Sequence, residues 1–196
     1  MSMSRTSLVL VLFLLCTSCA QVIYQKTGHG EFKGDLDVRW IEPNQFIYMP
    51  SEENPLRFTT SDQRVIQPQK MYTDGGSIPQ LFWGVPGLSP WGYAPAYIIH
   101  DWLFEAHHCD IPAYRDITFE RSASILAEGI KTMMVANPEI ESANALWAIY
   151  EAVNSPIAKS LWDKAQSCNP PVELFEKGKL PGVLLFKIRV STPPAR

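Results

Sequence analysis

A histidine and an aspartate stand side by side in an apolar segment of the chain. His100 and Asp101 follow two isoleucines and precede a tryptophan and a leucine. Adjacent side chains of a helix point about 100° apart, so the pair cannot form two solvated tips of one polar face. Polar groups among apolar helix positions need a hydrogen-bond partner or a water molecule. A histidine in such a place is a candidate general base.

Two further features could complete a site around this pair. Asp116 lies near the start of the next helical segment. If the two helices are antiparallel, its carboxylate could reach one ring nitrogen of His100 and leave the other free as a base. Asp101 would then face the turn that carries Gly75 and Gly76, where carboxylate and carbonyl oxygens suit a hard cation such as calcium. Two alternatives stay open: a purely structural network around His100, and a glycine turn without a ligand.

Three motifs of this region come in a fixed order along the chain. They are Thr73-Asp74-Gly75-Gly76-Ser77-Ile78-Pro79, Ala96-Tyr97-Ile98-Ile99-His100-Asp101-Trp102-Leu103-Phe104 and Arg115-Asp116-Ile117-Thr118-Phe119. Together they resemble a bacterial and phage family, the domain of unknown function numbered thirteen fifty-three. The resemblance covers residues 72–129. Because no activity is established for that family, the resemblance implies a fold and a site but no reaction.

The His-Asp helix is also similar, more distantly, to the catalytic helix of secreted phospholipases of the A-two type. In those enzymes the histidine is the general base, the adjacent aspartate binds calcium with a glycine-rich loop, and a second aspartate orients the histidine. The resemblance implies that His100 is the base and Asp116 its orienting carboxylate. Asp101 would bind calcium beside the glycine turn. The chain departs from that family in lacking its dense disulfides and in having Phe104 where a tyrosine contacts the orienting aspartate.

The first residues have the pattern of an export signal. Arg5 is followed by the apolar run Leu8–Leu15, which is too short to span a bilayer. The run ends in Cys16-Thr17-Ser18-Cys19, and a small residue directly before a cysteine resembles the lipobox of bacterial lipoproteins. Cys16 stands where that motif has an aliphatic residue. The pattern predicts a lipoprotein signal peptide over residues 1–18 and a lipid on Cys19, with an ordinary cleaved signal peptide as the alternative.

The residue after Cys19 is Ala20 and not aspartate. By resemblance to the sorting rule of Gram-negative lipoproteins, this favours the periplasmic face of the outer membrane. The expected partner is therefore the membrane, through the lipid anchor.

Charge and cysteine content bound the remaining possibilities. The chain has 17 basic and 20 acidic residues and a net charge of −3, without a basic stripe, so a nucleic-acid partner is not expected. Cys109 and Cys168 remain after export and lipidation. In an oxidising compartment they can form a disulfide or stay as two buried thiols, and no CxxC spacing indicates zinc.

The elements that must position these residues follow from the hydrophobic pattern. Short β-branched and aromatic stretches between turn residues predict strands at 38–41, 45–48, 56–59 and 64–66. Helical periodicity predicts helices over 93–107, 113–136 and 139–166, the last bent at Pro156, and one more strand at 183–190. The predicted fold is α+β, a small antiparallel sheet with two or three packed helices. Its boundaries are a tether over 19–36 and one domain over 37–190 with the His-Asp helix core at 72–129.

These features together predict an envelope lipoprotein with a His-Asp-Asp hydrolase site. Lipid or another ester is the expected substrate class, because the anchor places the site at a membrane surface, and calcium is the expected cofactor. A non-catalytic structural or binding lipoprotein is the alternative.

Overall fold

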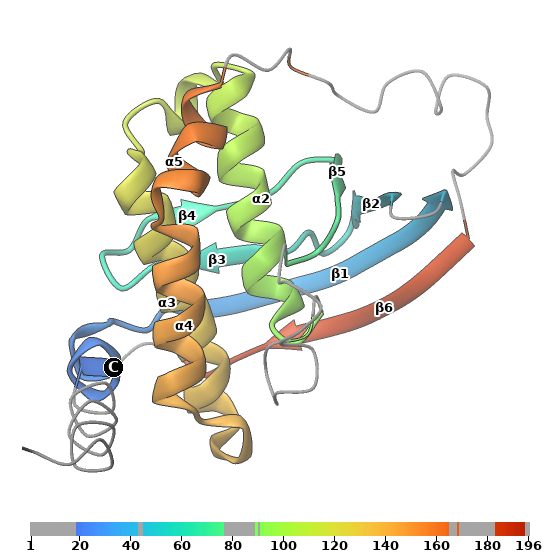
Figure 1. The fold of residues 1–196 in the computed structure, drawn as a ribbon. Coiled ribbons are helices and arrows are strands. Elements are labelled where there is room, and N and C mark those ends of the chain that lie inside the picture. Colours follow the sequence, from blue (N-terminus) through green and yellow to red (C-terminus); the bar gives the residue numbers. More distant parts are fainter. Residues whose placement is uncertain are drawn as a thin grey trace, which may run out of the picture.

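An antiparallel sheet with helices on one face forms the fold (Figure 1). The computed structural model describes residues 19–42, 45–76, 89, 91–164, 168 and 183–194. The signal peptide predicted over residues 1–18 lies outside these residues, as do Ser77, Ile78 and Pro79 of the first motif. The predicted α+β class, with a single domain, is confirmed.

The first strand is the centre of the sheet. The strands are β1 (Glu31–Glu42), β2 (Gln45–Pro50), β3 (Arg57–Thr59), β4 (Val65–Ile66), β5 (Met71–Thr73) and β6 (Val183–Ser191). Their order is β4-β3-β1-β2-β5, and β6 pairs with β1. Leu36 of β1 is opposite both Pro50 of β2 and Ile188 of β6, so these two strands lie on opposite edges of β1. The C-terminal strand thereby joins the sheet beside the N-terminal one.

Four α-helices cover one face of this sheet. They are α2 (Ala94–His108), α3 (Phe119–Ala136), α4 (Ala143–Val153) and α5 (Pro156–Asp163), with short 3₁₀ turns η2 (Pro112–Tyr114) and η3 (Pro138–Ile140). The predicted helix over 139–166 is two helices, because Ser155 caps a new one that starts at Pro156. The predicted helix over 113–136 begins only at Phe119, after the N-cap Thr118.

Alternating residues of β1 and the inner face of α2 form the core. Phe32, Leu36 and Val38 are fully buried, and each such side chain contributes about 1.5–3 kcal/mol. A Cβ atom on Gly129 of α3 would come 3.1 Å from Cβ of Ala96, so α2 and α3 approach each other closely. This contact fixes the position of α2 relative to α3, and with it the position of the His-Asp pair that α2 carries.

Residues 19–36 are part of the domain, so the prediction of a tether is wrong. Residues 19–26 are helical and Ala20 is fully buried. The ammonium group of Lys131 donates a hydrogen bond of 2.7 Å to the carbonyl oxygen of Tyr24 and a second one to that of Thr27, which holds the end of this helical segment on α3. The polar composition that suggested a tether reflects a helix with only one buried face and a strand whose outer side chains are polar.

The end of α2 is linked covalently to the segment after α5. Cys109 and Cys168 form a disulfide, which is the first of the two alternatives left open by the sequence. Among the described residues, no helix is both long and apolar enough to cross a membrane.

Candidate functional site

The His-Asp pair lies on the side of α2 that is turned away from the core. Ile98, Ile99, Trp102 and Leu103 form the buried face of the helix. His100 and Asp101 are each partly exposed on the other side. Tyr97, one helical turn before His100, is buried in the core, and Phe104, one turn after it, is partly exposed.

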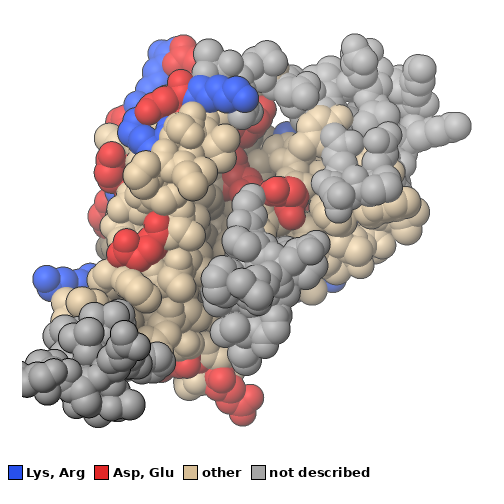
Figure 2. Space-filling model, in the orientation of Figure 1, with Lys and Arg blue, Asp and Glu red and all other residues tan. Residues whose placement is uncertain are grey.

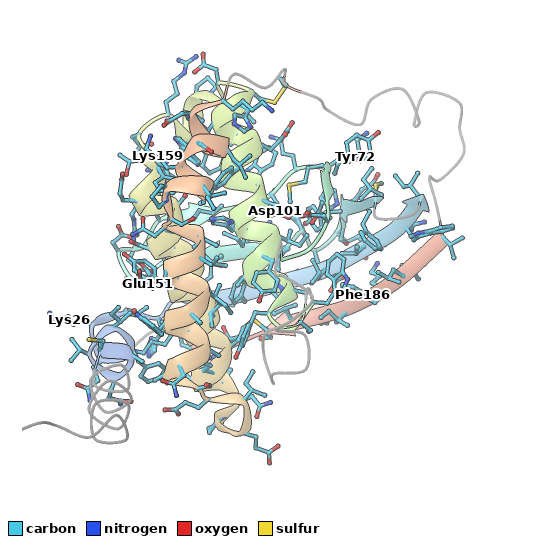
Figure 3. All side chains as sticks on the ribbon, in the orientation of Figure 1. Lys26, Tyr72, Asp101, Glu151, Lys159 and Phe186 are labelled. Atoms are coloured by element: carbon cyan, nitrogen blue, oxygen red, sulfur yellow. A yellow bond between two sulfur atoms is a disulfide. The ribbon has the colours of Figure 1, made fainter. Side chains whose placement is uncertain are left out.

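Asp101 is tied to the end of β5 through Thr73. The hydroxyl group of Thr73 donates a 2.7 Å hydrogen bond to Oδ2 of Asp101 and accepts one of 3.0 Å from the backbone N–H of Gly75. Asp101 therefore lies beside the glycine turn, as Figure 3 shows on the side of α2 toward Tyr72. Figure 2 shows acidic side chains in the hollow between the helices and this part of the sheet.

Both glycines of the turn are required by its geometry. Gly75 has a φ of +77°, in the left-handed region that favours glycine. A Cβ atom on Gly76 would come 2.8 Å from the ring of Tyr97. The backbone of the turn can approach α2 this closely only because Gly76 carries no side chain.

Burial shifts the pKa values of the two titratable groups in opposite directions. It raises the pKa of Asp101 to about 8, against the lowering effect of the Thr73 hydrogen bond, and the charge of Asp74 raises it further. It lowers the pKa of His100 to about 4. At neutral pH the site without a bound cation therefore holds a protonated carboxyl group beside a neutral imidazole.

The raised pKa of Asp101 predicts a pH-dependent stability. Between the ordinary pKa of 3.8 and about 8, the folded chain keeps a proton that the unfolded chain has released, so the free energy of unfolding falls as the pH rises. We expect Asp101→Asn, which keeps an acceptor for Thr73, to equal wild type near pH 4 and to exceed it in stability at pH 8. Urea unfolding in a chelating buffer measures this, and parallel pH profiles of the two proteins would contradict it.

The imidazole of His100 lacks a hydrogen bond on one of its ring nitrogens within the described part of the chain. Its Nε2 atom is buried and has no hydrogen-bond partner among the described residues. The ring lies with its centroid 5.0 Å from that of Phe104. The hydroxyl group of Tyr97, one turn earlier, is also buried without a partner in the described part of the chain. Nε1 of Trp102, on the buried side of the same helix, also lacks a partner among the described residues. Buried polar atoms without a partner are uncommon, and a functional role is one explanation for them.

Asp116 does not orient His100, so this prediction is wrong. Its two carboxylate oxygens accept hydrogen bonds from Arg64, which also donates to the carbonyl oxygen of Ala113. The side chain of Asp116 is 66% exposed, and Arg64 holds the pKa of its carboxyl group below the usual range. Asp116 lies in the turn between η2 and α3. This turn directs its side chain toward the hairpin formed by β3 and β4.

A second ion pair holds the same hairpin on α3. Glu128 accepts hydrogen bonds from the backbone N–H of Ser61, at 2.9 Å, and from Arg121, at 2.6 Å. Asp62 pairs with Arg121 as well. The carboxylates around α3 therefore have structural partners, and of the three acidic or basic residues predicted for the site only His100 and Asp101 remain in it.

The comparison with known families gives one match. The family described as Protein of unknown function (DUF1353) matches residues 52–150, half of the chain. The chain belongs to this family. The DUF1353 segment extends from before β3 into α4, so it contains both the glycine turn and the His-Asp helix, while β1 and β6 lie outside it. No curated protein and no solved structure matches the chain.

Two residues of the DUF1353 segment complete the site and were not among the predicted site residues. Thr73 opens the first motif and ends a strand of three residues. Such a strand is too short to show an alternating hydrophobic pattern, so the hydroxyl group of Thr73 could not be recognised as part of a site. Tyr97 lies one turn before the His-Asp pair. Tyr97 lies three residues before His100 and four before Asp101, a spacing that brings side chains together on a helix. This spacing could have identified Tyr97 as part of the site.

Proposed function

We propose that this protein is an envelope lipoprotein whose His100–Asp101 pair hydrolyses a lipid or another ester with the help of calcium. The observation that supports this most is the Nε2 atom of His100, in the residue next to the Asp101 carboxyl group, which is buried and has no hydrogen-bond partner among the described residues. Burying an unsatisfied polar atom costs about 1–3 kcal/mol, and such costs are characteristic of functional sites.

His100 would act as the general base. Burial lowers its pKa to about 4, so at neutral pH the imidazole is uncharged and a ring nitrogen is free to accept a proton, as a weaker base than an ordinary histidine. It would take the proton of a water molecule as the oxygen attacks the ester carbonyl, and would return it to the leaving alcohol. A base of this kind contributes a rate factor of about 10²–10⁴.

The donors around Asp101 fit a hard cation. The Asp101 carboxylate and the hydroxyl group of Thr73 are oxygen groups of the kind that calcium prefers. The backbone N–H of Gly75 faces Thr73, so carbonyl oxygens of the turn at Gly75 and Gly76 would have to complete the ligand set. Among the described residues, no basic side chain is bonded to Asp101. Calcium bound there would polarise the ester carbonyl, while Asp101 and Thr73 hold it beside His100.

The proposed location rests on the N-terminal pattern. Cys19 is exposed and carries a free thiol, so it is accessible to acylation. A lipid on this residue would keep the protein at the periplasmic face of the outer membrane, where esters of membrane lipids are available.

A calcium titration tests the cation site. We expect calorimetry of the mature protein at pH 8 to show calcium binding with proton release, because binding must displace the proton of Asp101. Binding should be lost in Asp101→Asn. It should be kept in Glu105→Gln, a matched change one turn further along α2. Absence of binding in wild type, or equal binding in Asp101→Asn, would contradict the proposed site.

A non-catalytic lipoprotein is the competing function. The chain of hydrogen bonds from Asp101 through Thr73 to Gly75 supports it, because this chain could serve only to fasten β5 to α2. An ester-hydrolysis screen with calcium across phospholipid and short-chain substrates separates the two. Activity that depends on both calcium and His100 supports the hydrolase, and its complete absence favours the structural role.

A further inference from the structure

The helical segment over residues 19–26 is fixed on the domain. The Lys131 ammonium group binds the carbonyl oxygens of Tyr24 and Thr27 at the C-terminal end of this segment, where the helix dipole favours a cation. Lys131 also lies 4.8 Å from the ring centroid of Tyr24, whose hydroxyl group is hydrogen-bonded to Glu141. The position of Cys19 relative to the sheet and the helices is therefore defined.

Three exposed apolar side chains lie at the same end of the molecule. Val22 is 47% exposed in the first helical segment, Val135 is 43% exposed one turn after Lys131, and Ile140 is 37% exposed in η3. We call residues 19–26, Val135 and η3 the anchor end, because Lys131, one turn before Val135, and Glu141, just after η3, both contact Tyr24. Burial of these side chains in an apolar surface would remove them from water, which is energetically favourable.

Charge neither favours nor opposes such a contact. The exposed side chain of Lys26, labelled in Figure 3, and that of Lys131 balance Glu139 and Glu141. An end of zero net charge with scattered apolar groups suits a bilayer surface of mixed headgroups better than it suits a nucleic acid or a strongly charged protein.

We propose that the anchor end rests on the lipid bilayer, with Val22, Val135 and Ile140 inserted at the boundary between headgroups and acyl chains. This inference rests on the proposed lipid at Cys19, since a lipid at the start of a fixed helix leaves no flexible spacer between bilayer and domain. The molecule then has one orientation on the membrane. A flexible tether would instead allow any face to approach the surface.

This orientation places the His-Asp pair close to the membrane. The hydroxyl group of Tyr93, just before α2, contacts the carbonyl oxygen of Ile140 at 3.5 Å, so α2 starts at the anchor end. His100 follows seven residues later, about 10 Å along the helix axis. A substrate that fits this distance between His100 and the membrane is an ester near the headgroup of a lipid in the same leaflet.

Fluorescent labels at single cysteines test the orientation. The full-length protein is purified from the envelope after lipidation and reconstituted in vesicles of phosphatidylethanolamine and phosphatidylglycerol that contain a doxyl-labelled lipid quencher. With Cys109 and Cys168 bonded and Cys19 acylated, an introduced cysteine is the free thiol for labelling. Val135→Cys and Ile140→Cys report the anchor end. Val65→Cys in β4 and Ile157→Cys in α5 are controls, because both positions are even more exposed, at 54% and 76%.

We expect the labels at 135 and 140 to lose most of their fluorescence and those at 65 and 157 to keep theirs. Equal quenching of all four labels in a protein that floats with the vesicles would overturn the fixed orientation and leave the anchor intact. A protein that does not float with the vesicles would overturn the anchor itself and this inference with it. The two failures are therefore distinguishable in one experiment.

Discussion

Replacing His100 by leucine is expected to abolish ester hydrolysis while leaving the protein as stable as wild type, or more stable by about 1 kcal/mol. Loss of a general base lowers kcat by about 10²–10⁴-fold. Stability is expected to be kept because the buried Nε2 atom has no partner to lose among the described residues, and an apolar side chain of similar volume removes its desolvation cost. Hydrolysis rates and urea midpoints of the two proteins measure both effects.

Thr73→Val is the matched control for this substitution. Thr73 is buried and makes two hydrogen bonds, so its replacement by an isosteric apolar residue should cost about 1–3 kcal/mol. If His100→Leu destabilised the protein as much as Thr73→Val does, the imidazole would have a structural role. The hydrolase proposal would then lose its main support.

Removing the disulfide is expected to lower the free energy of unfolding by about 4 kcal/mol. Cys109 and Cys168 are 59 residues apart, and cross-linking a loop of this length restricts the unfolded chain by about that amount. The double variant Cys109→Ser, Cys168→Ser should show the loss as a lower urea midpoint. Reduced wild type should reach the same midpoint.

The outcome that would contradict this prediction is an unchanged midpoint in both the variant and the reduced protein.

Equal activity of the variant and the oxidised protein under stable conditions is expected, because the disulfide is at the far end of α2 from Tyr97 and makes no hydrogen bond to the His-Asp pair.

The helices and most strands could be predicted because their patterns are local. The turn residues before β3 and the apolar period of α2 each specify one element. The boundaries failed where a single cap decided them, as at Thr118 and at Ser155. Strand β5 was missed because three residues are too short for an alternating pattern.

The site was predictable only where its residues are close in the chain or in one motif. His100 and Asp101 are adjacent, and the glycine turn lies within reach of Asp101 through Thr73. The role of Asp116 could not be predicted correctly, because its partner Arg64 comes from a hairpin 52 residues earlier. Nothing in the local pattern around Asp116 shows which of two distant groups it will meet.

The pairing of the first strand with the last one would have a consequence for the proposed export of the chain. The backbone N–H of Phe32 binds the hydroxyl group of Thr192, 160 residues away, and β1 and β6 lie side by side along their length (Figure 1). A chain that passes through a translocation channel with its N-terminus first delivers β1 early and β6 last. The central strand must wait for its second neighbour until almost the whole chain has emerged, and such long-range pairing slows folding. If the chain is exported as proposed, this topology would delay premature folding and keep the chain threadable during its passage across the inner membrane.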